Sequence, residues 1–261
     1  MTMVIYLLVG ALAGTLAGLL GVGGGLIIVP ALAWVFRDAG FPDEVVMHLA
    51  VGTSLAIIVF TAASSVRAHQ RRGAVRWDLT ARLAPAVVVG VLGGVTLASA
   101  LSTRGLALVF GLLEVLVAAY MAWGGRPRAG KGRPGPVDMA LTGCGIGLVS
   151  GLAGIAGGTM TVPLLVWWQV PMHVAVATSA AVGFPIAVAG SLGFVVTGWT
   201  ADLPPWSLGY VYLPALLGIA ATSVLFAPLG ATLAHRLRTG VLRRVFAVFL
   251  AMVGIRMLAG W

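Results

Sequence analysis

Two sequence elements of this chain each occur twice, and this duplication constrains the fold more than any other feature. The run GLLGVGGGLIIVP at 18–30 returns as GLAGIAGGTMTVP at 151–163, and MHLAVGTS at 47–54 returns as MHVAVATS at 172–179. The chain is therefore built from two copies of one unit. In both copies, glycine and proline interrupt apolar stretches, and in a membrane protein such paired interruptions point to a transport site.

The composition indicates that the duplicated unit lies in a membrane. Of the 261 residues, 60% are hydrophobic and 9% are charged, and the mean hydropathy is +1.06. Continuous apolar runs of about 20 residues match helices that cross a bilayer. These runs do not alternate between polar and apolar residues, which excludes a membrane β-barrel. We therefore expect an all-α polytopic protein of the cell (inner) membrane, in contact with the lipid bilayer.

The apolar runs predict ten membrane segments, five in each half of the chain. The long runs fall at 3–20, 45–66, 80–101, 105–124, 137–156, 173–196, 208–233 and 241–260. Two further runs, 26–36 and 159–168, are short and follow the glycine clusters. Eleven helical residues cover roughly 16 Å, about half of the hydrocarbon core. If these short segments cross, the halves are inverted repeats of five segments; if they dip in and return, the halves are parallel repeats of four.

The basic residues favour the inverted arrangement. Twelve of the sixteen Lys and Arg residues form three clusters, at 67–76, 126–133 and 236–244. Short basic loops stay on the cytoplasmic side, and only halves of five segments place all three clusters there, with both termini outside. We predict inverted repeats at 1–125 and 137–261, joined by a basic cytoplasmic linker at 126–136. Insertion into the membrane thus explains the net charge of +9, and no nucleic-acid partner is expected.

The glycine clusters are predicted to break helices inside the membrane. Irregular backbone survives there only where protein or water satisfies its polar groups. The helix that follows each break presents unpaired N–H groups and a positive dipole end, which together bind anions. Two such starts, brought together by symmetry, would cradle a small anionic substrate. The residues predicted to bind it are Gly21, Gly23, Gly24 and Gly25 in the first half and Gly154, Gly157, Gly158, Thr159 and Thr161 in the second.

Other glycines have a different expected role. Gly10, Gly14 and Gly18 are spaced by four residues, as are Gly147 and Gly151. This small-xxx-small pattern is typical of helices that pack closely against a neighbour.

The second repeated element adds further candidates for substrate binding. They are His48, Thr53 and Ser54 in the first half and His173, Thr178 and Ser179 in the second. Their recurrence at the same repeat positions favours a role at the site. The alternatives are packing near a helix end for the histidines and hydrogen bonds to the local backbone for the hydroxyls.

Glu114 is the acid that lies deep in a long apolar run, LALVFGLLEVLVAAY. A carboxyl group at that depth is costly and is by default a functional hypothesis. We predict a role in proton coupling, with a protonated side chain facing a neighbouring helix as the alternative.

Neither a metal ion nor a cofactor is expected. The lone Cys144 rules out an internal disulfide and a cysteine-rich metal site. No phosphate-loop motif is present, so ATP could drive the chain only through a partner. An intramembrane enzyme would need paired acids, metal ligands or a Ser–His dyad, and the sequence offers none in a suitable setting. A purely structural protein would not need duplicated breaks, and the sequence specifies no oligomeric state.

Taken together, the paired glycine runs, the elements HLAVGTS and HVAVATS, and the late stretch LGYVYLPALLGIAATSVLFAPLGATLAHRL resemble the TauE/SafE (sulfite exporter) family of membrane transporters. The resemblance covers essentially the whole chain. It implies a secondary carrier for a small anion, because the family is associated with movement of sulfite, sulfoacetate and related organic anions across the bacterial plasma membrane. The leading hypothesis is an exporter of sulfite or an organosulfonate that works by alternating access about a midplane site. An anion channel of the same fold is the alternative.

Overall fold

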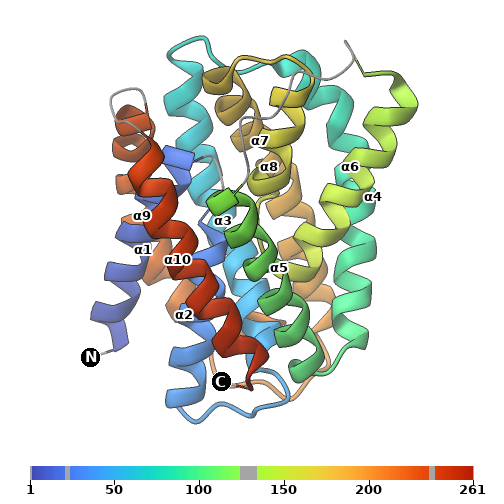
Figure 1. Cartoon of the computed structure of the whole chain (residues 1–261). Coiled ribbons are helices and arrows are strands. Elements are labelled where there is room, and N and C mark those ends of the chain that lie inside the picture. The colour runs from blue at the N-terminus through green and yellow to red at the C-terminus, as the bar shows by residue number, and fades with distance from the viewer. Residues whose placement is uncertain (1, 21–23, 124–133, 235–238, 261) are drawn as a thin grey trace.

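Helices account for nearly all of the computed structural model, which describes residues 2–20, 24–123, 134–234 and 239–260. This described part contains ten helices (Figure 1). The first half holds α1 (Thr2–Leu20), α2 (Gly25–Asp38), α3 (Val46–Gln70), α4 (Trp77–Ala100) and α5 (Thr103–Trp123). The second half holds α6 (Pro136–Ala153), α7 (Gly158–Trp167), α8 (Met172–Thr197), α9 (Leu213–Ala234) and α10 (Thr239–Leu258). The prediction of an all-α polytopic fold is confirmed.

Seven of the described helices are long and apolar enough to cross a membrane, namely α1, α3, α4, α5, α6, α8 and α9. The two short segments predicted after the glycine clusters are α2, with 14 residues, and α7, with 10. Large apolar side chains such as Leu12, Val89 and Leu217 are exposed on the outer surface, where acyl chains would contact them. Exposed tryptophans at helix ends, among them Trp77 and Trp199, match the aromatic belts of membrane interfaces.

Successive helices run in alternate directions, so the connections gather at two ends of the bundle (Figure 1). One end carries the turn between α3 and α4 and the facing ends of α9 and α10; the other carries the 39–45 and 198–212 connections and the C-terminus. The basic cluster at 67–76 therefore lies at the first end. The cluster at 126–133 lies outside the described residues, as do Arg236 and Arg238 of the third. This alternation is the one expected for five segments per half.

Close helix pairs hold the bundle together through glycine. α1 packs along α9, where a side-chain carbon added to Gly14 would lie 2.4 Å from the carbonyl oxygen of Ser223. α6 packs along α4 in the same way, since a carbon on Gly147 would lie 2.1 Å from the carbonyl oxygen of Val87. Gly10, Gly18 and Gly151 make equivalent contacts with backbone atoms. The predicted packing role of these glycines is confirmed.

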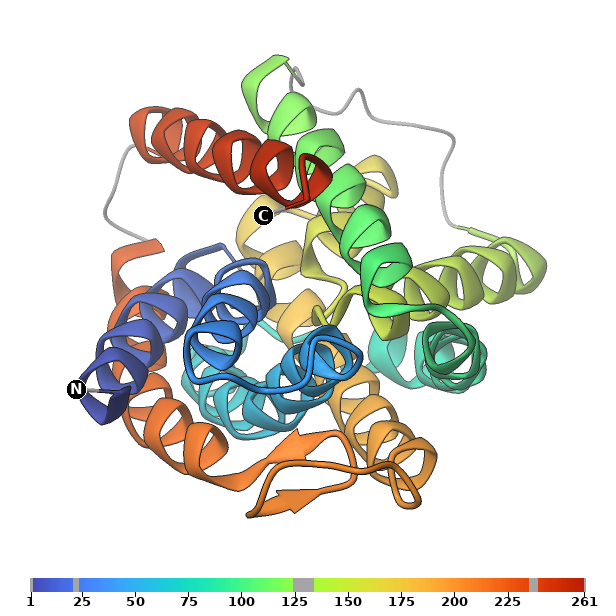
Figure 2. The ribbon, with the colours of Figure 1, turned by 90° about the horizontal axis from the view of Figure 1, so that it is seen from below.

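The view from below shows how the helices are arranged around α3 (Figure 2). α3 is buried over most of its length and contacts α2, α8 and α9, while α5 pairs with α10 at one side. At the end of α3, the guanidinium of Arg72 donates a 2.9 Å hydrogen bond to the carbonyl of Ala231 on α9. The middle of the protein is therefore built from both halves of the chain.

One predicted helix begins later than the sequence indicated. The apolar run 208–233 reads as a helix, but its first residues form a short antiparallel hairpin of β1 (Ser207–Leu208) and β2 (Val211–Tyr212). Gly209 turns the chain with a positive φ of 52°, which glycine adopts at little cost. The hydroxyl of Thr53 then accepts a 2.9 Å hydrogen bond from the N–H of Tyr212, and α9 starts at the next residue.

Candidate functional site

Both short helices start at a glycine in the left-handed conformation. Gly24 precedes α2 with φ 78°, and Gly157 precedes α7 with φ 69°. Neither helix start has a side-chain cap. α6 also ends at a left-handed glycine, Gly154, with φ 70°. The predicted breaks are confirmed at these positions, whereas Gly21 and Gly23 lie outside the described residues.

The two breaks lie directly against each other. A side-chain carbon on Gly25 would lie 2.4 Å from the carbonyl oxygen of Gly154 and 2.9 Å from the Cα atom of Ile155. The hydroxyl of Ser54 donates a 2.8 Å hydrogen bond to the same Gly154 carbonyl. The structure thus brings Gly24, Gly25 and Ser54 of the first half together with Gly154 of the second.

Each short helix leaves backbone N–H groups without an acceptor in the helix. The carbonyl of Gly24 accepts from the N–H groups of Ile27 and Ile28, and the carbonyl of Gly157 accepts from those of Met160 and Thr161. The N–H groups of Gly25 and Leu26 in α2, and those of Gly158 and Thr159 in α7, therefore come before the first hydrogen bond of their helix. Because both starts are buried inside the protein, these groups and the positive end of the helix dipole are shielded from bulk solvent.

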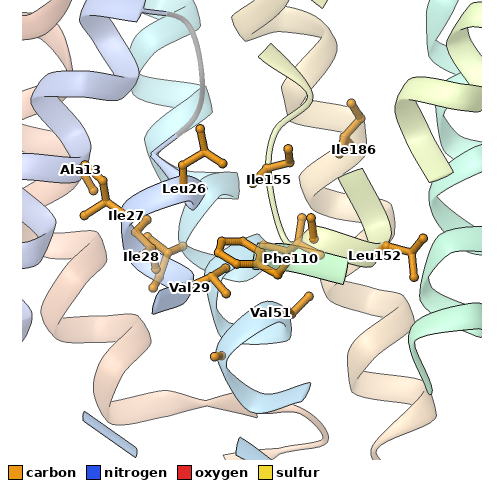
Figure 3. Packing of buried hydrophobic residues seen from close by; sticks show 14 of the residues in the cluster. Ala13, Leu26, Ile27, Ile28, Val29, Val51, Phe110, Leu152, Ile155 and Ile186 are labelled. Atoms are coloured by element: carbon orange, nitrogen blue, oxygen red, sulfur yellow. The ribbon is translucent and has the colours of Figure 1, made fainter. Parts of the chain in front are cut away.

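The side chains around the two starts differ. Near α2, the apolar side chains of Leu26, Val29, Val51, Phe110 and Ile155 are packed together and fully buried (Figure 3). The centre between the breaks is therefore closed in this conformation.

Near α7, two hydroxyl groups take the place of apolar atoms. The hydroxyl of Ser150 lies 2.9 Å from the position that a Cβ atom on Gly157 would occupy. Neither Ser150 nor Thr159 has a hydrogen-bond partner for its hydroxyl in the described part of the chain. Ser150 was missed by the sequence reasoning; the signal that could have found it is a serine one turn before the break where the first half has Ala17.

The other predicted hydroxyls bind backbone groups. Thr161 donates a 2.9 Å hydrogen bond to the carbonyl of Gly157, and Ser179 donates one of 2.8 Å to the carbonyl of Val176. Thr178 accepts a 3.1 Å hydrogen bond from the N–H of Arg76, which directly precedes α4. Thr53 holds the residue directly before α9 in the same way. These two threonines therefore fix the starts of two equivalent helices.

The structure does not bring the two predicted histidines together. His48 is buried at the start of α3, and its Nε2 atom lies 3.1 Å from the carbonyl oxygen of Ala98. Its ring lies 5.1 Å from that of Tyr210, and burial raises the pKa of the Tyr210 phenol. His173 is exposed and is the second residue of α8, and α8 begins at the opposite end of the bundle from the start of α3 (Figure 1).

Glu114 lies on the buried face of α5. It is fully buried, and neither carboxyl oxygen has a hydrogen-bond partner among the described residues. Gly254 of α10 lies opposite, since a carbon added there would be 3.1 Å from the Cβ atom of Glu114. Phe110, one helical turn earlier, reaches the apolar cluster at the breaks (Figure 3). Glu114 therefore shares the helix face that points to the centre of the protein.

A cavity of about 630 Å³ lies between α2 and α10. One end is lined by Ile27 and Pro30, in the first two turns of α2. The other end carries Arg37 and Asp38 of α2 and Arg256 of α10. The cavity thus leads from beside the first break to two guanidinium groups.

Comparison with known proteins assigns the chain to a family. The sequence profile of the sulfite exporter TauE/SafE family matches residues 6–257. The chain belongs to this family. It is similar to a protein of Haemophilus influenzae named "Probable membrane transporter protein", with 38% identity over 96% of both chains. It is also similar to a Xylella fastidiosa protein of the same name, with 30% identity over 94% of this chain and 91% of the relative.

The chain is also similar to a Bacillus subtilis protein named "Probable membrane transporter protein YunE", with 24% identity over 99% of this chain and 98% of the relative. No solved structure matches the chain. The family and these relatives show that the protein is a multi-pass membrane transporter and not an enzyme.

Proposed function

We propose that this TauE/SafE protein is a secondary transporter that exports a small sulfur-containing anion, such as sulfite or an organosulfonate. The name of the family, sulfite exporter TauE/SafE, supports this class of substrate. The observation that carries the proposal is the meeting of two glycine breaks, each followed by an uncapped helix start, in the interior of the protein. Unpaired N–H groups at a helix start are a ready-made site for an anion.

The proposed architecture is a pair of inverted repeats, 1–125 and 137–261, joined by the basic linker 126–136. If each helix is replaced by its counterpart in the other half, the α1–α9 pair becomes the α6–α4 pair. The two helices of each pair run parallel to one another and touch at glycine residues. The same exchange turns the Thr53–Tyr212 hydrogen bond into the Thr178–Arg76 bond. Under this proposal, the end that carries the 67–76 cluster is cytoplasmic.

Alternating access would move the substrate between the two sides of the membrane. The packed side chains between the breaks close the centre, so the halves must rock apart before an anion enters or leaves. The cavity along α2 provides a path from the first break to Arg37, which pairs with Asp43, and to Arg256, whose charge would attract an anion. Gly24, Gly25, Gly157, Gly158 and Thr159 would line the site; Ser54 and Gly154 hold the breaks in contact.

Proton coupling through Glu114 completes the proposal. A buried carboxyl group without a hydrogen-bond partner is most stable as the neutral acid. The group can release its proton when the site opens to water. His48 and His173 are placed too far from one another to act on one proton together, so Glu114 is the proposed coupling residue.

Flux in proteoliposomes tests this function. The purified protein is reconstituted, loaded with radiolabelled sulfite or sulfoacetate at mildly alkaline pH, and diluted into buffer with or without an imposed pH gradient. We expect saturable efflux that exceeds that of empty liposomes and responds to the gradient. Absence of flux for every sulfur anion would overturn the proposal, and conductive flux that does not saturate would indicate a channel.

A further inference from the structure

Two hydroxyl groups at the second break, those of Ser150 and Thr159, differ from most hydroxyls of the bundle; Ser65 on α3 is another buried hydroxyl without a partner among the described residues. Hydroxyls within the helices usually donate to a backbone carbonyl three or four residues earlier, as in Thr61 to Ile57 and Ser191 to Val188. Ser150 and Thr159 lack such a bond in the described structure. Both hydroxyls are buried, and burying a hydroxyl without a partner is unfavourable. Such groups in a native protein call for an explanation, and a missing ligand is one.

The position of Ser150 relates it to the start of α7. Its side chain is fully buried, and its hydroxyl oxygen occupies the space beside Gly157 that a side chain would otherwise fill. Gly157 is the uncapped, left-handed residue from which α7 begins. The absence of a side chain on Gly157 therefore leaves the Ser150 hydroxyl beside the residue from which α7 begins, and the free N–H groups of Gly158 and Thr159 follow directly in the chain.

The first half has no equivalent donors. Matching the two glycine runs pairs Ser150 with Ala17, and Thr159 with Leu26. Both first-half side chains are apolar and buried. Leu26 also contributes to the apolar cluster between the breaks (Figure 3). The two helix starts are therefore alike in backbone conformation but unlike in the groups that surround them.

We infer that the anion is held at one break, the second, by four donors: the hydroxyls of Ser150 and Thr159 and the N–H groups of Gly158 and Thr159. The α2 start, with its apolar cluster, forms the wall that closes over the anion. An SO₃ group, as in sulfite or a sulfonate, has three oxygen atoms with enough lone pairs to accept from all four donors. This inference rests on the proposed function and adds to it an asymmetric site and a new residue, Ser150.

The test compares variants that lack one donor each. Ser150→Ala and Thr159→Val remove the hydroxyls with little change in volume, and flux is measured over a range of sulfite concentrations. We expect KM to rise at least about 10-fold in each variant, because a hydrogen bond to a charged group is lost. The melting temperature of Ser150→Ala should not fall, since the hydroxyl has no partner in the empty protein. A purely structural role would instead lower it and leave KM unchanged.

Matched controls come from hydroxyls that bond to their own helix. Ser191→Ala and Thr197→Val on α8 remove such groups and should leave KM unchanged. If the wild type shows no flux, the proposed function fails. If the wild type transports sulfite while Ser150→Ala and Thr159→Val keep the wild-type KM, the proposed function stands and the asymmetric site is overturned.

Discussion

A single methyl group at Gly25 should separate the two breaks. In Gly25→Ala, the new carbon would lie 2.4 Å from the carbonyl oxygen of Gly154 and 2.9 Å from the Cα atom of Ile155. Ordinary contact needs about 1 Å more than the shorter distance, and both partners are backbone atoms that cannot rotate away. Overpacking of this kind costs about 1–3 kcal/mol, while alanine regains about 1 kcal/mol of helix propensity.

The effect on transport should therefore exceed the effect on stability. The net loss of about 0–2 kcal/mol lowers the melting temperature by no more than about 8 °C for a chain of this size. A shift of about 1 Å in groups that position a substrate can reduce activity by about 100-fold. We expect Gly25→Ala to insert and fold but to lose most sulfite flux in proteoliposomes.

Gly145→Ala is the matched control, because an added carbon there meets no atom within 4 Å. It should keep wild-type flux and a wild-type or slightly higher melting temperature. If Gly25→Ala also matches the wild type in both measurements, the contact between the breaks is not the one described and the reasoning is refuted.

Three further predictions concern the bundle around the breaks. Glu114→Leu should raise the melting temperature, because it removes a buried polar group without a partner, which costs about 1–3 kcal/mol of stability. The same change should abolish the response of flux to a pH gradient. An unchanged response would exclude Glu114 from coupling. Gly14→Ala should destabilise the α1–α9 pair by about 1–3 kcal/mol in thermal unfolding, whereas Gly93→Ala, with open space around it, should not; equal melting temperatures would contradict the packing. Thr53→Val and Thr178→Val should each lower the free energy of unfolding by about 1 kcal/mol. The two losses should add in the double variant, since the two threonines share no partner. A loss of stability in only one of the two single variants would count against equivalent roles.

Much of the fold could be predicted because glycine and apolar length are direct physical signals. Each long predicted span overlaps a helix, and the short helices begin where the glycine clusters placed them, at Gly25 and Gly158. Glycine adopts the left-handed conformation at a helix start at the lowest cost, so the glycine clusters that contain Gly24 and Gly157 predicted the two breaks. The hairpin at 207–212 was missed because its residues continue an apolar run, and only Gly209 marks the turn.

The candidate site was less readable, because its residues depend on contacts between the halves. The paired histidines share a repeat position, but α3 and α8 begin at opposite ends of the bundle (Figure 1), which separates His48 from His173. Thr53 and Thr178 also recur, and their contacts show that recurrence marked the anchoring of α9 and α4. Ser150 could be missed because it does not recur. An alignment of the two halves that searched for polar residues present in one half and absent from the other would have found Ser150.

The central claim is that an uncapped helix start holds the anion, and the affinity of Gly157 variants for sulfite tests it most directly. Asn and Asp both tolerate the left-handed conformation, so Gly157→Asn and Gly157→Asp differ mainly by one negative charge. The three atoms nearest to the position of a Cβ atom at Gly157 belong to the side chains of Ile146, Ser150 and Ile186 and not to the backbone. We predict weaker sulfite transport for Gly157→Asn and none for Gly157→Asp, in proteins that both fold. Wild-type affinity and flux in both variants would contradict it.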